Sequence, residues 1–237
     1  MILSPHKEKP KVMVKVNGQI LETQTKVKIL GFVLDEKLLL DEHVKAIRSK
    51  TRSGLFALKL ASKRGLNIRT LIQMANGLVC SHLHYCDIAL SQAAKTTLDR
   101  LQARQDQVVR LIYKLAPWCD VDSHRRHLGW LDLDGKRNVH LATLIFRAQR
   151  NEAPAAICEF FRRAGDKPKK HRFNFRDYRT TDLEVPRWTK RRLQMTLQYR
   201  GAMFWNGLPN HIHRSKTADS CRQKTFNLLM KLSKKSI

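Results

Sequence analysis

The chain is poor in acidic residues: 20 aspartates and glutamates stand against 46 lysines and arginines, which gives a formal net charge of +26. Such a surplus destabilises a compact state by self-repulsion unless a polyanion offsets it. Nucleic acid, bound through its backbone phosphates, is therefore the first partner that the composition predicts. An acidic membrane surface would also attract this charge.

Long hydrophobic runs are absent as well, which excludes a membrane-spanning helix. The N-terminal stretch lacks the apolar centre of a signal peptide. The five cysteines are odd in number and scattered, as is typical of a reducing compartment rather than of a disulfide framework. We therefore expect an intracellular protein of the nucleus or cytoplasm that is neither secreted nor embedded in a membrane.

Hydrophobic residues make up 42% of the 237 residues, which is enough to build a core. Their periodicity predicts a mostly α-helical fold with a small antiparallel β element at the N-terminus. Asn17-Gly18 is a strong hairpin-turn signal. The apolar run over 27–34 predicts one buried strand. So few strands are marginal alone, and we expect them to pack on the helices that follow.

Apolar residues at three- and four-residue spacing predict helices over 44–60, 68–89, 95–115 and 134–151, with shorter ones at 123–128, 154–164 and 218–232. Asn67 is the expected N-cap of the second, Asp122 or Ser123 of the turn at 123, and Asp134 of the helix that it begins. The third helix carries a heptad-like seam with Gln105 as its polar position. Four cations lie off that seam: Arg100, Arg104, Arg110 and Lys114.

These patterns divide the chain into five segments. We expect a β element at 1–35, a helical bundle at 36–118, a helical extension at 119–164, a basic extended loop at 165–187 and a helical region at 188–237.

Two groups of cations are the candidate binding surfaces. The first lies on the helix predicted at 44–60 and just beyond it: Arg48, Lys50, Arg52, Lys59, Lys63 and Arg64. The second lies in the basic loop: Lys169, Lys170, Arg172, Arg176 and Arg179, interleaved with Phe173, Phe175 and Tyr178. Cations there would meet phosphates and the rings would stack on bases. The competing interpretation is a solvated charged face. The aromatic residues around Trp205 are better read as core.

No arrangement for catalysis or metal binding emerges. Cys80, His82, His84 and Cys86 are close in sequence, but on a helix only two of them share a face, and a structural zinc site needs four ligands. No nucleophile elbow and no phosphate-binding glycine loop occurs. The sequence thus predicts no catalytic residue, no metal site and no bound cofactor.

Several landmarks together resemble the reverse transcriptases of non-LTR (LINE-type, jockey-like) retrotransposons. They are Leu3-Ser4-Pro5-x-Lys7, Val16-Asn17-Gly18-Gln19-x-Leu21-Glu22, Val27-Lys28-Ile29-Leu30-Gly31-Phe32-Val33-Leu34-Asp35 with Glu42-His43-Val44, His82-Leu83-x-Tyr85-Cys86, Leu98-x-x-Leu101-Gln102-x-x-Gln105 with Arg110-Leu111-Ile112, and Phe204-Trp205-Asn206-x-Leu208-Pro209-x-x-Ile212. In that family these motifs follow the catalytic YADD box in the same order. The resemblance implies the end of the palm at 1–35, a helical thumb at 36–118 and a helical C-terminal extension.

The resemblance also assigns roles to three residues. Lys7 is similar to a palm lysine, although an ordinary terminal lysine is the favoured interpretation. Leu30 and Gly31 are similar to the primer grip. Gly31 also reads as a tight-packing residue beneath the first helix. The family holds two metal ions with palm carboxylates that this chain lacks, so Mg²⁺ is expected only with that missing palm.

The chain also departs from the family pattern at Ile29, Leu40 and Ala89-Leu90-Ser91. We therefore expect a non-catalytic fragment of an RNA-directed DNA polymerase that binds an RNA or DNA template-primer. Two alternatives stay open: a helical protein–protein interaction module with a basic surface, whose heptad seam takes a partner helix, and a pseudogene product without selected function. The sequence does not decide the oligomeric state or the form of the nucleic acid.

Overall fold

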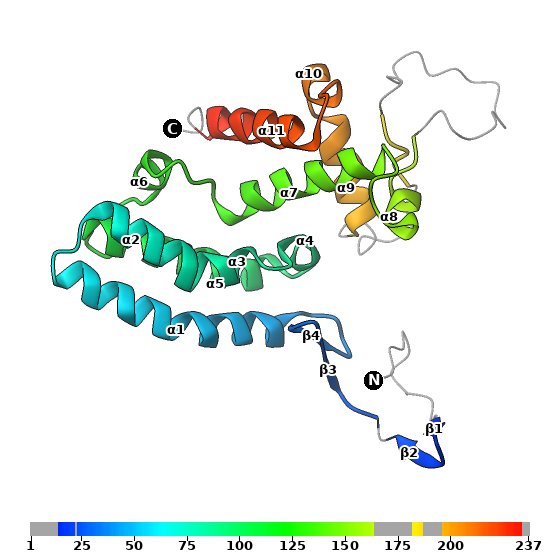
Figure 1. The fold of residues 1–237 in the computed structure, drawn as a ribbon, viewed down its shortest axis with the longest axis horizontal. Helices are drawn as coiled ribbons and strands as arrows, with labels where there is room; N and C mark the ends of the chain where they lie inside the picture. Colours follow the sequence, from blue (N-terminus) through cyan, green and yellow to red (C-terminus); the bar gives the residue numbers. More distant parts are fainter. Residues whose placement is uncertain (1–13, 22, 164–181, 187–195, 234–237) are drawn as a thin grey trace. The chain divides into compact units, whose positions relative to one another are not determined.

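A computed structural model describes residues 14–21, 23–163, 182–186 and 196–233 (Figure 1). As predicted, the fold is mostly helical, with a small antiparallel β element near the N-terminus. The chain forms two compact units. The first contains the residues up to Cys86 together with Ala93–Cys119, and the second contains Asp87–Gln92 together with the residues from Asp120 onward.

The β element consists of two separate hairpins. Strands β1 (Val14–Val16) and β2 (Gln19–Leu21) are antiparallel, and Val16 pairs with Gln19. Asn17 and Gly18 join them with φ angles of 49° and 79°. Two positive φ angles in a two-residue loop match the twist of the flanking strands, so the predicted Asn-Gly hairpin is confirmed.

The single buried strand predicted over 27–34 is wrong. It is a second hairpin, with strands β3 (Lys26–Ile29) and β4 (Phe32–Asp35) paired in antiparallel register. Leu30 and Gly31 form its turn, with φ angles of 47° and 84°. Glycine accepts such an angle at no steric cost, which lets the chain reverse inside an apolar run. Strand β3 is mostly exposed, and β4 is half-buried.

Helix α1 (Asp41–Lys63) is the longest element of the first unit and extends the predicted 44–60 helix at both ends. The linker that leads into it is held by Asp35, whose carboxylate accepts the backbone N–H groups of Lys37, Leu39 and Leu40 at 2.9–3.2 Å. Gly65, with φ 77°, ends the helix by donating to the Ser62 carbonyl. Glycine after the last turn commonly closes a helix in this way.

The continuous helix predicted over 68–89 is interrupted. Its pieces are α2 (Ile68–Ala75), a π-helical turn η1 (Asn76–Cys80), α3 (Ser81–His84) and α4 (Asp87–Leu90). The predicted N-cap is confirmed, since the Asn67 side chain accepts from Thr70 N–H at 2.8 Å. The break before α4 occurs at Cys86, which has a left-handed φ of 52°. The wide π turn brings backbone of Leu78 against Gly54 of α1.

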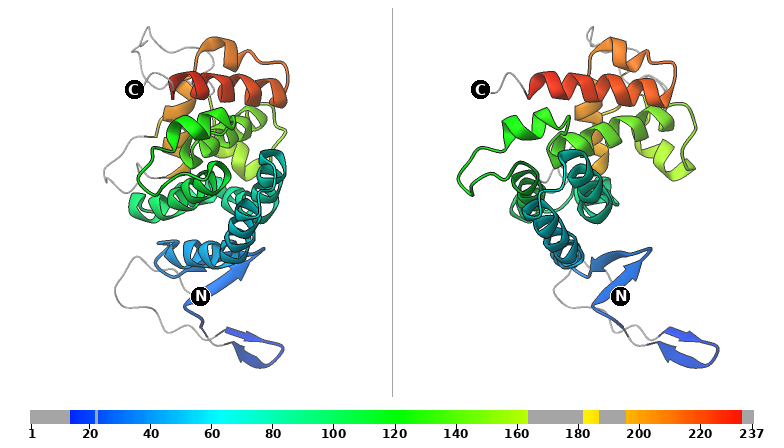
Figure 2. Two further views of the ribbon diagram at one scale, coloured as in Figure 1. Left: turned by 90° about the vertical axis from the view of Figure 1, so that its left-hand side faces the viewer. Right: turned by 60° about the vertical axis from the view of Figure 1, so that its left-hand side comes forward.

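Helix α5 (Lys95–Tyr113) lies parallel to α1. Thr97 at its start donates to Asp41 of α1 at 2.6 Å, and Leu111 near its end accepts from Ser62 at 2.7 Å. Gln105 is buried with 2% of its surface exposed, which confirms the polar core position. Lys114 ends the helix with φ 56°. The unit is thus a helical bundle of α1, α2 and α5, with hairpin β3–β4 at the N-terminal end of α1 (Figures 1 and 2).

The second unit contains α4, α6 (Asp122–His127), α7 (Leu133–Ala148), α8 (Ala155–Phe160), α9 (Leu197–Asn206), α10 (Asn210–His213) and α11 (Ala218–Leu232). Its core gathers Ile145, Phe161 and Trp205, which is 3% exposed, so the prediction of Trp205 as a core residue is confirmed.

Helix starts in this unit are shifted relative to the predicted caps. Asp132, not Asp134, caps α7 by accepting Gly135 N–H at 2.8 Å. Before α6, Asp120 lies one residue ahead of the N-cap Val121 and accepts the N–H groups of Asp122 and Ser123 at 3.1 and 3.4 Å. In both cases an aspartate upstream of the predicted cap accepts N–H groups of the first turn, which have no partner within the helix.

Candidate nucleic-acid interface

Four of the predicted cations share one face of α1. Arg48, Arg52, Lys59 and Lys63 follow one another at spacings of four, seven and four residues, and all are exposed. A helix turns about 100° per residue, so these spacings place the four side chains in one row along α1. The row runs beside the buried face that holds Val44, Leu55 and Leu58.

The other two predicted cations are not part of this row. Lys50 follows Arg48 by two residues, which places it on the other flank of the helix. Lys50 lies near His43 instead. The pKa of His43 is lowered, mainly by burial and secondly by the charge of Lys50. Arg64 lies beyond the last helical residue, at the C-cap. The predicted band of six is therefore a row of four with two cations elsewhere.

Helix α5 brings further cations close to this row on α1. The pKa of Arg104 is lowered, first by burial and then by the charges of Arg48 and Arg52. Like charges act in this way only when they are close. Arg104 also donates to Gln107 at 3.1 Å. We name the resulting surface the cationic groove, formed by Arg48, Arg52, Lys59 and Lys63 of α1 with Arg104 and Arg110 of α5 and Lys114 at the C-cap of α5.

Among the described residues, the cations of the groove have no acidic partners. Ion pairs in the first unit gather near the start of α1, where Glu42 holds Lys26 and Lys45 at 2.6 and 2.8 Å and Asp41 holds Arg100 at 3.5 Å. Across the described residues, no carboxylate lies within 4.0 Å of a groove cation. The positive charge of the groove is therefore uncompensated within the part of the chain that the structure describes.

Two donors of the groove are also unsatisfied. The Nε atoms of Arg104 and Arg110 are buried, and neither has a hydrogen-bond partner among the described residues. Buried donors normally find an acceptor in the protein or in ordered water, and leaving one unmade costs free energy. Each arginine thus carries a buried donor without a partner among the described residues.

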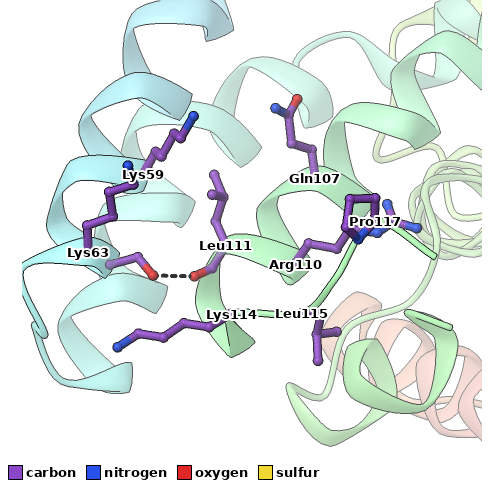
Figure 3. Close-up of a pocket in the computed structure, with 9 residues that line it drawn as sticks. Lys59, Lys63, Gln107, Arg110, Leu111, Lys114, Leu115 and Pro117 are labelled. Carbon is purple, nitrogen blue, oxygen red and sulfur yellow. Dashed lines mark hydrogen bonds between the residues drawn. The ribbon is translucent and has the colours of Figure 1, made fainter. Parts of the chain in front are cut away.

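The groove ends in a hollow of about 520 Å³ between the C-terminal ends of α1 and α5 (Figure 3). Lys59 and Lys63 line it from α1, and Arg110 and Lys114 line it from the C-terminal end of α5. Its apolar wall is made of Leu111, Leu115 and Pro117. The hydrogen bond between Ser62 and the Leu111 carbonyl fixes the spacing of the helices beneath it.

Hairpin β3–β4 is fastened to the helices at its turn. The Tyr85 hydroxyl donates to the Leu30 carbonyl, and a Cβ on Gly31 would lie 3.8 Å from the Tyr85 ring. The neighbouring Cys86 raises the pKa of Tyr85, so its hydroxyl remains a donor. The expected packing of Gly31 beneath the first helix is wrong, because Gly31 is a turn residue that packs on Tyr85. The Leu30 side chain is 88% exposed.

The base of the same hairpin is held by α1. The imidazole Nδ1 of His43 accepts Val33 N–H at 3.3 Å, and its ring packs on Phe32 with centroids 4.0 Å apart. Glu42 binds Lys26 of β3, and this hydrogen bond, with a second from Lys45, lowers the pKa of Glu42 to about 2. The motif residues around Gly31, Asp35 and His43 therefore build a joint that fixes the exposed turn relative to the groove.

Other predicted site residues lie outside the described residues. They are Lys7 and the second basic group, Lys169, Lys170, Arg172, Arg176 and Arg179. Within the described ranges, no three His, Cys, Asp or Glu side chains gather as a metal site. The same ranges contain no helix with the length and apolar character needed to cross a bilayer.

Sequence patterns missed the α5 half of the groove. Arg104, Arg110 and Lys114 lie off the heptad seam, which predicts that they are on the solvent-facing side of α5. The pattern does not show which other helix lies next to that side. Their pairing with α1 depends on contacts between residues about fifty positions apart. No family model, curated protein or solved structure matches the chain. Its function is therefore inferred from the groove, the joint and the motifs.

Proposed function

We propose that this chain is a thumb-like part of a reverse transcriptase similar to those of non-LTR retrotransposons, and that it binds template-primer through backbone phosphates. The observation that carries the proposal is the cationic groove, whose seven cations are uncompensated within the described residues. Phosphate contacts position a duplex without reading its sequence, so selectivity among sequences is weak.

The row of cations on α1 suits a polyanion better than a single acidic side chain. Arg48, Arg52, Lys59 and Lys63 extend along most of the length of α1, and a helix rises about 1.5 Å per residue, so the row spans roughly 20 Å. Duplex DNA offers a phosphate about every 1.7 Å of its axis, counting both strands. A row of this length can therefore meet several phosphates at once.

The joint supports the second part of the proposal. Leu30 stands exposed and Gly31 half-buried at the tip of a hairpin that Tyr85, His43 and Glu42 hold against the helices. This arrangement suits a turn that contacts the primer strand while the groove holds the duplex. The chain carries no pair of palm carboxylates, so in this proposal it binds without polymerising, and Mg²⁺ chemistry belongs to a palm.

The alternative of a helical interaction module required a free seam on α5. Leu101, Val108 and Ile112 of that seam are buried at 0–4% exposure in the core of their own unit. No described feature of α5 therefore favours a partner helix over nucleic acid. Light scattering on nucleic-acid-free protein gives an independent check, and a stable oligomer assembled in the absence of nucleic acid would favour the alternative.

The proposal is tested by binding of a fluorescent RNA–DNA hybrid to the chain at increasing salt. With about six phosphates neutralised, the slope of log K against log salt is about −5, and affinity falls by about 10³ between 50 and 200 mM salt. Hybrids of unrelated sequence should bind alike. An affinity that stays flat over this range, or that follows one sequence, contradicts the proposal.

A charge-matched pair of variants locates the binding. The double variant Arg48→Gln/Arg52→Gln removes two groove cations, and Lys50→Gln/Arg64→Gln removes two cations of α1 or its cap that lie off the row. Two lost contacts lower affinity by about 60-fold at 0.1 M salt if the curves converge at 1 M. The control should stay within about threefold of the unaltered chain, because counterion release is tied to the contacts made.

A further inference from the structure

We propose that the hollow between the C-terminal ends of α1 and α5 binds a nucleoside phosphate, with the phosphates on its lysines and the base on its apolar wall (Figure 3). The inference rests on the proposed function in one respect, since the same groove that would hold a duplex leads into the hollow. It assigns a second ligand class to the four groove cations that line the hollow.

The hollow has the size of a nucleotide site. Its volume of about 520 Å³ lies within the range of roughly 300–1,000 Å³ that is usual for small-molecule sites. Two rigid helices form its sides, and the hydrogen bond from Ser62 to the Leu111 carbonyl at 2.7 Å ties them together at the base. The site is therefore preformed rather than assembled by a loop.

The charge of the hollow favours a phosphorylated ligand. Four cations line it, namely Lys59, Lys63, Arg110 and Lys114, and none of the described residues that line it is a carboxylate. Both helices end there, and each C-terminus carries roughly half a negative charge, so about +3 remains. This residual charge matches a di- or triphosphate. One or two of the lysines offset the partial negative charge of the helix C-termini, and the remaining positive charge is available to a ligand.

The apolar wall distinguishes a nucleoside phosphate from a bare anion. Leu111, Leu115 and Pro117 face the hollow, and the aliphatic stems of Lys59 and Lys63 add to this surface. Inorganic phosphate would leave the wall in water, whereas a base would cover it and gain from the removal of apolar surface. Gln107 on the rim supplies an amide that can meet polar atoms on the base edge.

The ligand can come from two sources. It is either a free nucleotide or an unpaired nucleotide of a strand whose duplex part lies in the groove. The recognising chemistry is the same in both, and the experiment distinguishes them by offering each source separately.

The first arm titrates the full chain calorimetrically with ATP, and separately with inorganic tripolyphosphate, in low salt without magnesium. We expect ATP to bind at least about tenfold more tightly than tripolyphosphate, since the nucleoside covers the apolar wall of the hollow and the bare polyphosphate does not. Equal affinities would overturn the inference, as they would show an anion site only. Absence of ATP binding would overturn it too.

The variant Lys63→Gln/Lys114→Asn removes two cations of the hollow. Asparagine tolerates the left-handed backbone of position 114 (φ 56°), so the fold is retained, and a thermal melt verifies this. ATP affinity should fall at least about tenfold. Retention of full ATP affinity would overturn the inference. The comparison variant Arg48→Gln/Arg52→Gln should keep ATP affinity while losing duplex affinity.

The second arm compares a blunt duplex with the same duplex carrying a short single-stranded overhang. A preference for the overhang that disappears in Lys63→Gln/Lys114→Asn supports an unpaired nucleotide as the ligand, whereas ATP binding without such a preference supports a free nucleotide. The two proposals fail separately. Salt-insensitive duplex binding contradicts the proposed function alone, and loss of ATP binding with intact duplex binding contradicts only the inference about the hollow.

Discussion

Replacing Gly54 by alanine should destabilise the first unit, although Gly→Ala in a helix interior usually stabilises by about 0.5–1 kcal/mol. A Cβ at Gly54 would lie 2.6 Å from the Leu78 carbonyl oxygen and 3.0 Å from the Leu78 Cβ. The nearest atom is backbone, so α1 and the π turn must move apart. Overpacking of this kind costs about 1–3 kcal/mol. This cost is larger than the propensity gain over most of its range.

The measurement is urea unfolding followed by circular dichroism at 222 nm. Gly77→Ala is the matched control, because it lies in the same π turn and a Cβ there meets nothing within 4 Å. We expect Gly54→Ala to lower the free energy of unfolding by about 1–2 kcal/mol after the propensity gain is subtracted, and Gly77→Ala to be neutral or stabilising. A Gly54→Ala chain at least as stable as the unaltered one would refute the close packing of α1 on η1.

Two further predictions concern the joint between hairpin β3–β4 and the helices. Burial and Lys50 lower the pKa of His43, so the unfolded chain binds more protons in the window below the ordinary value of about 6.5. The contribution of His43 to the free energy of unfolding should be fully present above that value and should be lost as pH drops through the lowered pKa. His43→Gln should flatten this part of a plot of unfolding free energy against pH. An unchanged slope would show that His43 does not titrate there. Tyr85→Phe removes the hydrogen bond to Leu30. Amide exchange in β3 and β4 should accelerate by about two- to tenfold, as a net hydrogen bond of about 0.5–1.5 kcal/mol implies, with little change in α5. Equal exchange in both chains would contradict the fastening.

Local signals in the sequence identified several elements correctly. Asn17-Gly18 specified its hairpin, Asn67 its N-cap, and the heptad-like spacing of α5 placed Gln105 in the core. Each of these depends on residues within one turn or one helix, where propensity and periodicity act directly. The fold class follows from the same signals.

The remaining features depend on contacts that are distant in sequence. The turn at Leu30 and Gly31 lacks an asparagine or aspartate before the glycine, and its apolar neighbours resemble a continuous strand. The break of the 68–89 helix is associated with packing of Leu78 against Gly54. The groove needed the pairing of α1 with α5, which joins Ser62 to Leu111 and Asp41 to Thr97. No local pattern contains that information.

The most direct test of the central claim is the salt slope of hybrid binding for the charge-matched variants of α1. If phosphates lie in the cationic groove, Arg48→Gln/Arg52→Gln should reduce the slope by about 2, from about −5 to about −3, because each lost duplex contact removes about 0.9. Lys50→Gln/Arg64→Gln carries the same charge change and should leave the slope at about −5. Equal reductions in both variants would show that net charge rather than the groove governs binding, and would contradict the account.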